Sequence, residues 1–173
     1  MYSFEFVKPA TLDEALAALK DEDAQPLSGG QTLIPTMKQR LNQPGSLVSL
    51  LGIPELVGVS ISDNVLSIKG ATNHAAIVAE TRDSFPGLSA LAGKIGDPAV
   101  RNRGTIGGSI ANNDPSACYP AAAMACQATI MTNAREIAAD DFFEGMFTTA
   151  LEEGEIMTGV RFPIPQTANY QKF

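Results

Sequence analysis

The sequence has few of the side chains that enzymes commonly use for chemistry. Its 173 residues include two cysteines, Cys118 and Cys126, a single histidine, His74, and no tryptophan. Two cysteines cannot supply the four thiolates of an iron–sulfur cluster, and without CxxC or HxxxH spacing they form no zinc motif with the histidine. A Ser-His-Asp triad would depend on His74, but no nucleophile elbow lies near it. We interpret His74 as a helix-start or packing residue, and we expect any catalysis to depend on an organic cofactor.

Clustered basic residues and long apolar runs are also absent. Twelve Lys and Arg against nineteen Asp and Glu give a formal net charge of −7. The only basic groupings are Lys38–Arg40 and Arg101–Arg103, so we expect no nucleic-acid binding. No apolar stretch approaches the ~20 residues of a membrane span. The N-terminus lacks the basic start and apolar middle of a secretory signal, and we therefore expect a cytoplasmic protein.

The periodicity of what is present predicts an α+β protein. Thr11 is a candidate N-cap, with Glu14 completing a capping box, and apolar residues recur at helical spacing from Leu12 to Leu19. Alternating apolar and polar residues on either side of Asp63-Asn64 predict an antiparallel hairpin. Other patterns predict helices near 33–40, 74–81, 87–95 and 120–128, and strands near 25–30, 46–50, 128–132, 135–138 and 155–163.

Two glycine pairs interrupt these patterns. Gly29 and Gly30 lie in LSGGQTLIPTMK, and Gly107 and Gly108 lie in GTIGGSIANNDP. A glycine pair lets successive N–H groups point the same way and lets the backbone approach a ligand closely, which suits a phosphate where a helix follows. Neither motif is GxGxxG or GxxxxGK[ST]. Two converging loops would suit the two phosphates of a dinucleotide, and the alternative is two unrelated tight turns.

The segments SGGQTLIPTMKQRL and GDPAVRNRGTIGGSIANNDPSACYPAAA together resemble the FAD-binding medium subunit of the molybdenum hydroxylases. This is the family of xanthine dehydrogenase and aerobic carbon monoxide dehydrogenase. The resemblance extends from YSFEFVKPATLDEALAAL to DDFFEGMFTTALEEGEIMTGVRFPIP. It implies a two-lobed vanillyl-alcohol-oxidase-type (PCMH-type) fold that holds FAD non-covalently. We expect a small α/β lobe over residues 1–55 and a larger lobe with a mainly antiparallel sheet over residues 56–173.

The resemblance also implies which residues hold the cofactor. The two glycine motifs would hold the pyrophosphate and neighbouring parts of FAD, Ile95 would flank the flavin, and Met157 and Lys172 would be later contacts. Cys118 stands where many relatives carry an aspartate that can face the cofactor, and a thiol does not replace a carboxylate's charge. No catalytic side chain or metal ligand is implied. The implied contacts are Ser28, Gly29, Gly30, Gln31, Thr32, Leu33, Ile95, Thr105, Ile106, Gly107, Gly108, Ser109, Cys118, Met157 and Lys172.

The function implied by the resemblance is electron transfer. The flavin would collect electrons from iron–sulfur clusters on a small partner subunit, which receive them from a molybdopterin cofactor on a large partner, and would pass them to NAD or another acceptor. We expect the family's C-terminal domain to be absent, because the sequence stops at YQKF, where that domain would begin. Two alternatives stay open: an assembly module that has lost or weakened FAD binding, and a self-contained flavin oxidase.

Overall fold

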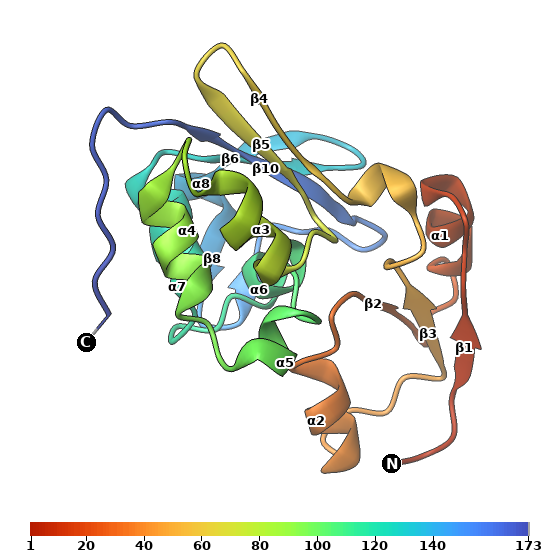
Figure 1. Cartoon of the computed structure of the whole chain (residues 1–173). Helices are drawn as coiled ribbons and strands as arrows, with labels where there is room; N and C mark the ends of the chain where they lie inside the picture. The colour runs from red at the N-terminus through yellow and green to blue at the C-terminus, as the bar shows by residue number, and fades with distance from the viewer. Residues whose placement is uncertain (173) are drawn as a thin grey trace.

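A small parallel sheet forms the N-terminal part of the molecule. The computed structural model describes residues 1–172, and Figure 1 shows this sheet in red to yellow-brown. Its strand order is β1-β3-β2, and both pairings are parallel. β2 is an edge strand, which is where a sheet tolerates a proline such as Pro26. The elements are β1 (Glu5–Val7), α1 (Leu12–Ala18), β2 (Ala24–Leu27), α2 (Leu33–Lys38) and β3 (Ser46–Ser49).

The start of α1 confirms Thr11 as an N-cap and changes one detail of the capping box. The Glu14 N–H donates to Thr11 Oγ1 at 3.2 Å. The Glu14 carboxylate accepts from the N–H of Ala10 at 2.7 Å, one residue before the cap. Both bonds satisfy backbone donors that a helix start leaves without partners.

A five-stranded antiparallel sheet forms the larger part of the fold. Its order is β4-β5-β10-β6-β7, so the last strand of the sheet in the sequence lies at its centre. The predicted hairpin is confirmed, because β4 and β5 pair across Asp63 and Asn64, whose φ angles are 51° and 61°. The strands are β4 (Val59–Ser62), β5 (Val65–Lys69), β6 (Thr129–Thr132), β7 (Glu136–Ala138) and β10 (Met157–Pro163).

Helices pack against one face of this sheet and enclose the main core. Leu66, Ile68 and Val160 are fully buried at alternate positions on adjacent strands, so they share one face. Helical residues such as Ile77 and Ile110 belong to the same buried cluster. Figure 1 shows the helices together beneath the sheet. The remaining elements are a 3₁₀ turn (Pro54–Leu56), α3 (His74–Thr81), α4 (Pro86–Gly93), α5 (Pro98–Arg101), α6 (Ile106–Asn112), α7 (Cys118–Ala125), α8 (Ala139–Phe142), β8 (Phe143–Gly145) and β9 (Thr148–Thr149).

A second, smaller core ties the two sheets together. It contains Ala15, Val48 and Ile53, and it also includes Ala71 and Ile156 from the larger part of the chain. Because these residues are 0–5% exposed, the two sheets share buried apolar surface, which stabilises their relative position. Among residues 1–172, no helix is long and apolar enough to span a bilayer.

Two predicted boundaries were wrong. The alanine-rich helix α7 begins at Cys118 rather than Pro120, because proline is tolerated anywhere in a first turn, where N–H groups have no helical acceptor. Gly107 and Gly108 lie inside helix α6 rather than in a loop before a helix. The Thr105 cap and burial of the helix offset the weak helix propensity of glycine.

Candidate functional site

The two glycine motifs line the same cleft. Its volume is about 720 Å³. Figure 1 shows the chain between β2 and α2 passing beside α5 and α6. Strand, loop and helix residues from both parts of the fold contribute to the walls. Among the lining residues are Leu27, Ser28, Gly29, Gly30, Gln31, Thr32, Leu33, Leu41, Ile95, Val100, Gly104, Thr105, Gly107, Gly108, Ser109, Asp114, Leu151, Glu155, Ile156 and Met157.

The motifs touch each other directly. The hydroxyls of Ser28 and Thr105 are 2.7 Å apart and share a hydrogen bond. Thr105 Oγ1 also accepts from the Gly108 N–H at 3.1 Å as the N-cap of α6. A side chain on Gly29 would overlap the carbonyl oxygen of Arg103. One threonine therefore caps a helix and joins the two motifs.

The four glycines are needed for different reasons, and only one leaves room in the cleft. A methyl group on Gly107 would lie 2.6 Å from the carbonyl oxygen of Gly70, so Gly107, like Gly29, permits contact between backbone segments. Gly30 has a φ of +67°, a left-handed conformation that favours glycine. A methyl group on Gly108 would meet only Thr105 Oγ1 at 3.1 Å and Ser28 Cβ at 3.8 Å. The interpretation that missing side chains make room for a ligand therefore fits Gly108 alone.

Backbone donors also distinguish the motifs. In the second motif the Ile106 N–H donates to Thr72 O at 3.1 Å and the Gly107 N–H donates to Gly70 O at 2.9 Å. Within residues 1–172, the five N–H groups of residues 29–33 have no hydrogen-bond acceptor. Unpaired backbone donors at a cleft wall can bind an anion. The first motif is therefore the one with free donors.

Three of the remaining predicted contacts lie away from the cleft surface. Ile95 and Met157 line the cleft, but Ile106 is fully buried in the core. Cys118 lines a separate apolar pocket of about 230 Å³ with Cys126 and Tyr170. Lys172 is exposed and lies outside the cleft lining.

The charge of the cleft wall is unusual for an anion site. Its lining contains the carboxylates of Asp114 and Glu155 and, within the described chain, no Lys or Arg. An anion would therefore depend on backbone N–H groups and hydroxyls rather than on a cation. No group of three or more His, Cys, Asp and Glu in the part of the chain described here could hold a metal ion.

His74 is the first residue of α3, belongs to the cleft lining and packs against Gly104 at the start of the second motif. It is 4% exposed, its N–H donates to Gly104 O at 3.0 Å, and its Nδ1 lies 3.3 Å from the Tyr119 hydroxyl. Burial, and to a smaller extent the nearby positive charge of Arg101, lowers the pKa of His74 from 6.5 to about 4. The imidazole is neutral at physiological pH, as expected of a packing residue.

Sequence reasoning predicted Met157 but missed the other residues of the cleft wall at 151–157. Leu151, Glu155 and Ile156 line the cleft. The strand predicted near 155–163 includes the last two, but its pattern does not indicate that they meet the glycine motifs. Leu41, which also lines the cleft, is 74% exposed, and an isolated exposed leucine is not by itself a binding signal. Only the tertiary fold brings these residues to the glycine motifs.

Comparison with known proteins agrees with this geometry. Residues 2–165 match the family described as the FAD binding domain in molybdopterin dehydrogenase. The carbon monoxide dehydrogenase medium chain of Afipia carboxidovorans is 38% identical over 96% of this chain and 61% of its own length. The glyceraldehyde dehydrogenase medium chain of Sulfolobus acidocaldarius is 37% identical over 93% of this chain and 60% of its own.

Solved structures show the same fold. The crystal structure of the cyanide-inactivated Cu,Mo-CO dehydrogenase aligns with a TM-score of 0.91 and 36% identity, covering 96% of this chain and 61% of that one. Quinoline 2-oxidoreductase from Pseudomonas putida 86 aligns with a TM-score of 0.91 and 35% identity, covering 95% and 60%. This chain spans about 60% of the length of the relatives that it matches. The chain belongs to the FAD-binding domain family of the molybdopterin dehydrogenases, and its two-part α+β architecture is the PCMH-type fold of that family.

Proposed function

We propose that this chain binds FAD in the cleft between its two glycine motifs and acts as the electron-transfer flavoprotein part of a molybdenum hydroxylase. The observation that carries the proposal is in the first motif: residues 29–33 line the cleft, their five N–H groups have no acceptor in residues 1–172, and the described cleft lining contains no Lys or Arg. A pyrophosphate offers oxygen acceptors for these donors.

The residues present fit FAD. The N–H groups of residues 29–33 would donate to the pyrophosphate, and the hydroxyls of Thr32 and Ser109 lie on the same cleft. Gly108 leaves space for close approach of the ligand to α6. Leu41, Ile95 and other apolar side chains would cover the ring systems and exclude water. When bound, the flavin supplies reversible uptake and release of electrons.

The wider role is part of the same proposal. A small iron–sulfur subunit and a large molybdopterin subunit would be the partners, and NAD or another molecule would accept the electrons. The lobe division at residues 1–55 and 56–173 would place the flavin between the two sheets. Two free cysteines suit a reducing compartment, which supports the cytoplasm as the location.

The two alternatives have less support. Cys118 was one of two observations that favoured the assembly module, and this thiol lines the separate apolar pocket and not the cleft. A self-contained oxidase needs an acid or base at the reacting centre. Of the titratable residues in the described cleft lining, the His74 ring is buried, and the Glu155 carboxylate already accepts hydrogen bonds from Arg135, Thr132 and Glu152. The third, Asp114, accepts from the N–H and hydroxyl of Ser116.

Flavin reconstitution tests the proposal. Flavin-free protein is titrated with FAD and with FMN, and binding is followed by the visible absorption bands and the loss of flavin fluorescence. We expect FAD to bind at least about tenfold more tightly, because FMN lacks the pyrophosphate and adenylate, and tenfold corresponds to about 1.4 kcal/mol. Equal binding of FMN, or no binding of FAD, would contradict the proposal.

A further inference from the structure

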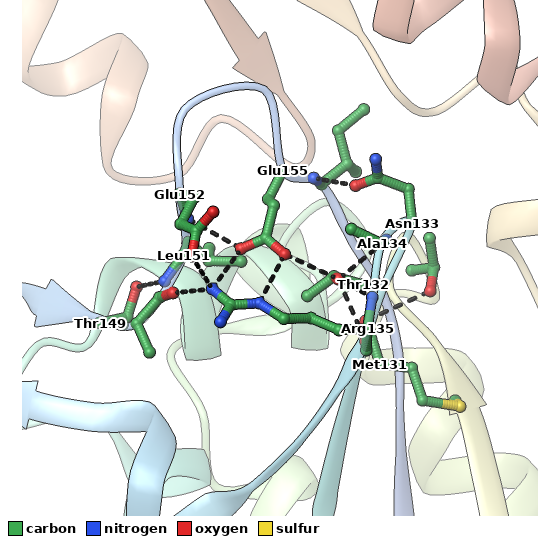
Figure 2. A network of polar contacts seen from close by, with 12 residues as sticks. Met131, Thr132, Asn133, Ala134, Arg135, Thr149, Leu151, Glu152 and Glu155 are labelled. Atoms are coloured by element: carbon green, nitrogen blue, oxygen red, sulfur yellow. Dashed lines mark hydrogen bonds and ion pairs between the residues drawn. The ribbon is translucent and has the colours of Figure 1, made fainter.

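The cleft wall formed by residues 151–157 is held by a polar network from the neighbouring β6–β7 turn. Figure 2 shows the Arg135 side chain extending beneath the Glu155 carboxylate towards Leu151 and Glu152. Ile156 and Met157, which line the cleft, follow Glu155 directly. The position of this wall therefore depends on what holds Glu155.

Arg135 donates hydrogen bonds to both ends of the segment from Ala150 to Glu155. Its Nε and Nη2 donate to the two carboxylate oxygens of Glu155 at 2.9 and 3.0 Å, in the fork geometry that guanidinium and carboxylate share. The same Nη2 donates to the carbonyl oxygen of Ala150 at 2.7 Å. One side chain thus fixes residues 150 and 155 relative to the turn.

The Glu155 carboxylate also accepts hydrogen bonds from two other donors. Oε1 accepts from Thr132 Oγ1 at 3.2 Å, and Oε2 accepts from the N–H of Glu152 at 2.8 Å. The side chain is 6% exposed. The pKa of Glu155 is lowered to about 2, and the hydrogen bonds from Arg135 are the largest cause. The carboxylate is therefore ionised at neutral pH.

Asn133 completes the attachment on the cleft side. Its Oδ1 accepts from the Ile156 N–H at 2.7 Å, and its own N–H donates to Ile156 O at 3.1 Å. Ile156 is 3% exposed and packs in the small core between the sheets. The turn at residues 132–135 therefore holds Glu155 and the residue after it.

We propose that Arg135 and Glu155 are a positioning pair that sets this wall of the cleft and holds Ile156 and Met157 at the distance that the ligand requires. The inference rests on the proposed function insofar as that ligand is FAD. Neither residue is a catalytic residue, since each acts through the backbone of residues 150–157.

The chain supplies a matched control. Glu152 also pairs with Arg135 Nη2, at 3.0 Å, but 74% of its side chain is exposed, and exposed pairs contribute little. In the Glu155→Gln variant the amide nitrogen must face either Arg135 Nε and Thr132 or Arg135 Nη2 and the Glu152 N–H. In either orientation the NH₂ group of the glutamine would face an N–H donor of Arg135, and neither group could accept a hydrogen bond. Glu152→Gln creates no such conflict, because this side chain is exposed and water can pair with its amide.

The first experiment uses flavin-free protein. Hydrogen-exchange protection factors, which correct for the intrinsic rate of each residue type, are measured for the N–H groups at positions 152 and 156 in the wild type, Glu155→Gln and Glu152→Gln. We expect exchange at these positions to become at least about tenfold faster in Glu155→Gln, and to stay unchanged in Glu152→Gln. Equal exchange in all three proteins would overturn the positioning role whether or not FAD binds.

The second experiment titrates the same proteins with FAD and records the visible circular dichroism of the bound flavin, with melting temperature measured alongside. We expect Glu155→Gln to bind FAD about tenfold more weakly and to change the flavin dichroism, and Arg135→Lys, which keeps the charge but loses the fork, to give an intermediate result. If wild type binds FAD and Glu155→Gln binds it equally with the same spectrum, the inference is wrong. If wild type itself binds no FAD, the proposed function is wrong, and the exchange result alone decides the positioning role.

Discussion

The two glycine motifs have almost the same composition and use it in opposite ways. In the first, the N–H groups of residues 29–33 have no acceptor in the described chain, and Gly30 adopts a left-handed φ of +67°. In the second, the corresponding N–H groups donate to Thr72, Gly70 and Thr105. The first motif is open to a ligand, whereas the second is mainly committed to the protein's own backbone.

This difference shows that a glycine pair does not by itself indicate a phosphate loop. Gly107 is required because another backbone segment passes within contact distance, and this constraint would exist with no ligand bound. Gly108, one residue later on the same helix, faces the cleft. Because consecutive helical residues point in different directions, Gly107 meets the protein's own backbone while Gly108 is directed to the cleft.

The largest expected effect separates these two neighbours. Gly107→Ala would place a methyl group 2.6 Å from Gly70 O, and we expect at least about 3 kcal/mol loss of unfolding free energy or failure to fold. Gly108→Ala should change stability by no more than about 0.5 kcal/mol and weaken FAD binding. Urea unfolding and flavin titration measure the two outcomes. Similar stability of both variants would show that the second motif does not depend on backbone contact.

The next effect concerns His74, whose N–H donates to Gly104 at the start of the second motif. His74 has a pKa of about 4 in the folded state against 6.5 ordinarily. Between these values the unfolded chain binds the proton more readily than the folded chain. The contribution of His74 to the free energy of unfolding is therefore fully present above pH 6.5 and is lost as the pH falls towards 4. We expect a loss of roughly 3 kcal/mol from this group.

Urea unfolding at several pH values measures the histidine's contribution, with His74→Gln as the variant that removes it. The carboxylate of Glu155, with a pKa of about 2 against 4.5, loses its contribution only at lower pH. The two titrations are therefore separable. An unchanged pH dependence in His74→Gln would assign the acid sensitivity to other groups.

A smaller effect tests the conformation of the first motif. Gly30→Ala would force a Cβ into a left-handed φ of +67°, and its methyl would lie 3.0 Å from Ile34 Cγ1. We expect a loss of about 1 kcal/mol of stability and a reduced affinity for FAD, because the free N–H groups would turn away. Gly58→Ala, at a φ of +135° with no atom within 4 Å, serves as a strained control outside the cleft lining. Loss of FAD affinity in both variants would point to general strain instead.

The smallest expected effect is at the contact between the motifs. Ser28→Ala removes the 2.7 Å hydrogen bond to Thr105 but leaves the Thr105 cap on α6. We expect a loss of about 0.5 kcal/mol, measured by urea unfolding. A change below about 0.3 kcal/mol, within the usual scatter of surface substitutions, would mean that the motifs are held together by packing alone.

Much of the fold was predictable because local chemistry specified it. Thr11 caps α1 by its own side chain, and Asp63-Asn64 supply the two positive φ angles of the β4–β5 turn. The similar composition of the two glycine motifs suggested that they converge, the family resemblance implied the same, and the structure places both on one cleft. Each of these features depends on residues close together in the sequence or on a recognisable motif.

The rest depends on contacts between distant residues. α5 has four residues and β9 has two, which is too short for any periodicity to appear. The wall at residues 151–157 depends on Arg135, twenty positions before Glu155. The different roles of Gly107 and Gly108 depend on Gly70, which no pattern in the second motif indicates.

The central position of β10 also determines when the protein can fold during its synthesis. β10 pairs with β5 on one side and β6 on the other, so the larger sheet cannot close until residues 157–163 have left the ribosome. The parallel sheet of residues 5–49 can pair much earlier. Strands β4–β5 and β6–β7 would meanwhile be separate hairpins with unpaired inner edges, which makes the nascent chain dependent on protection from aggregation until its last strand arrives.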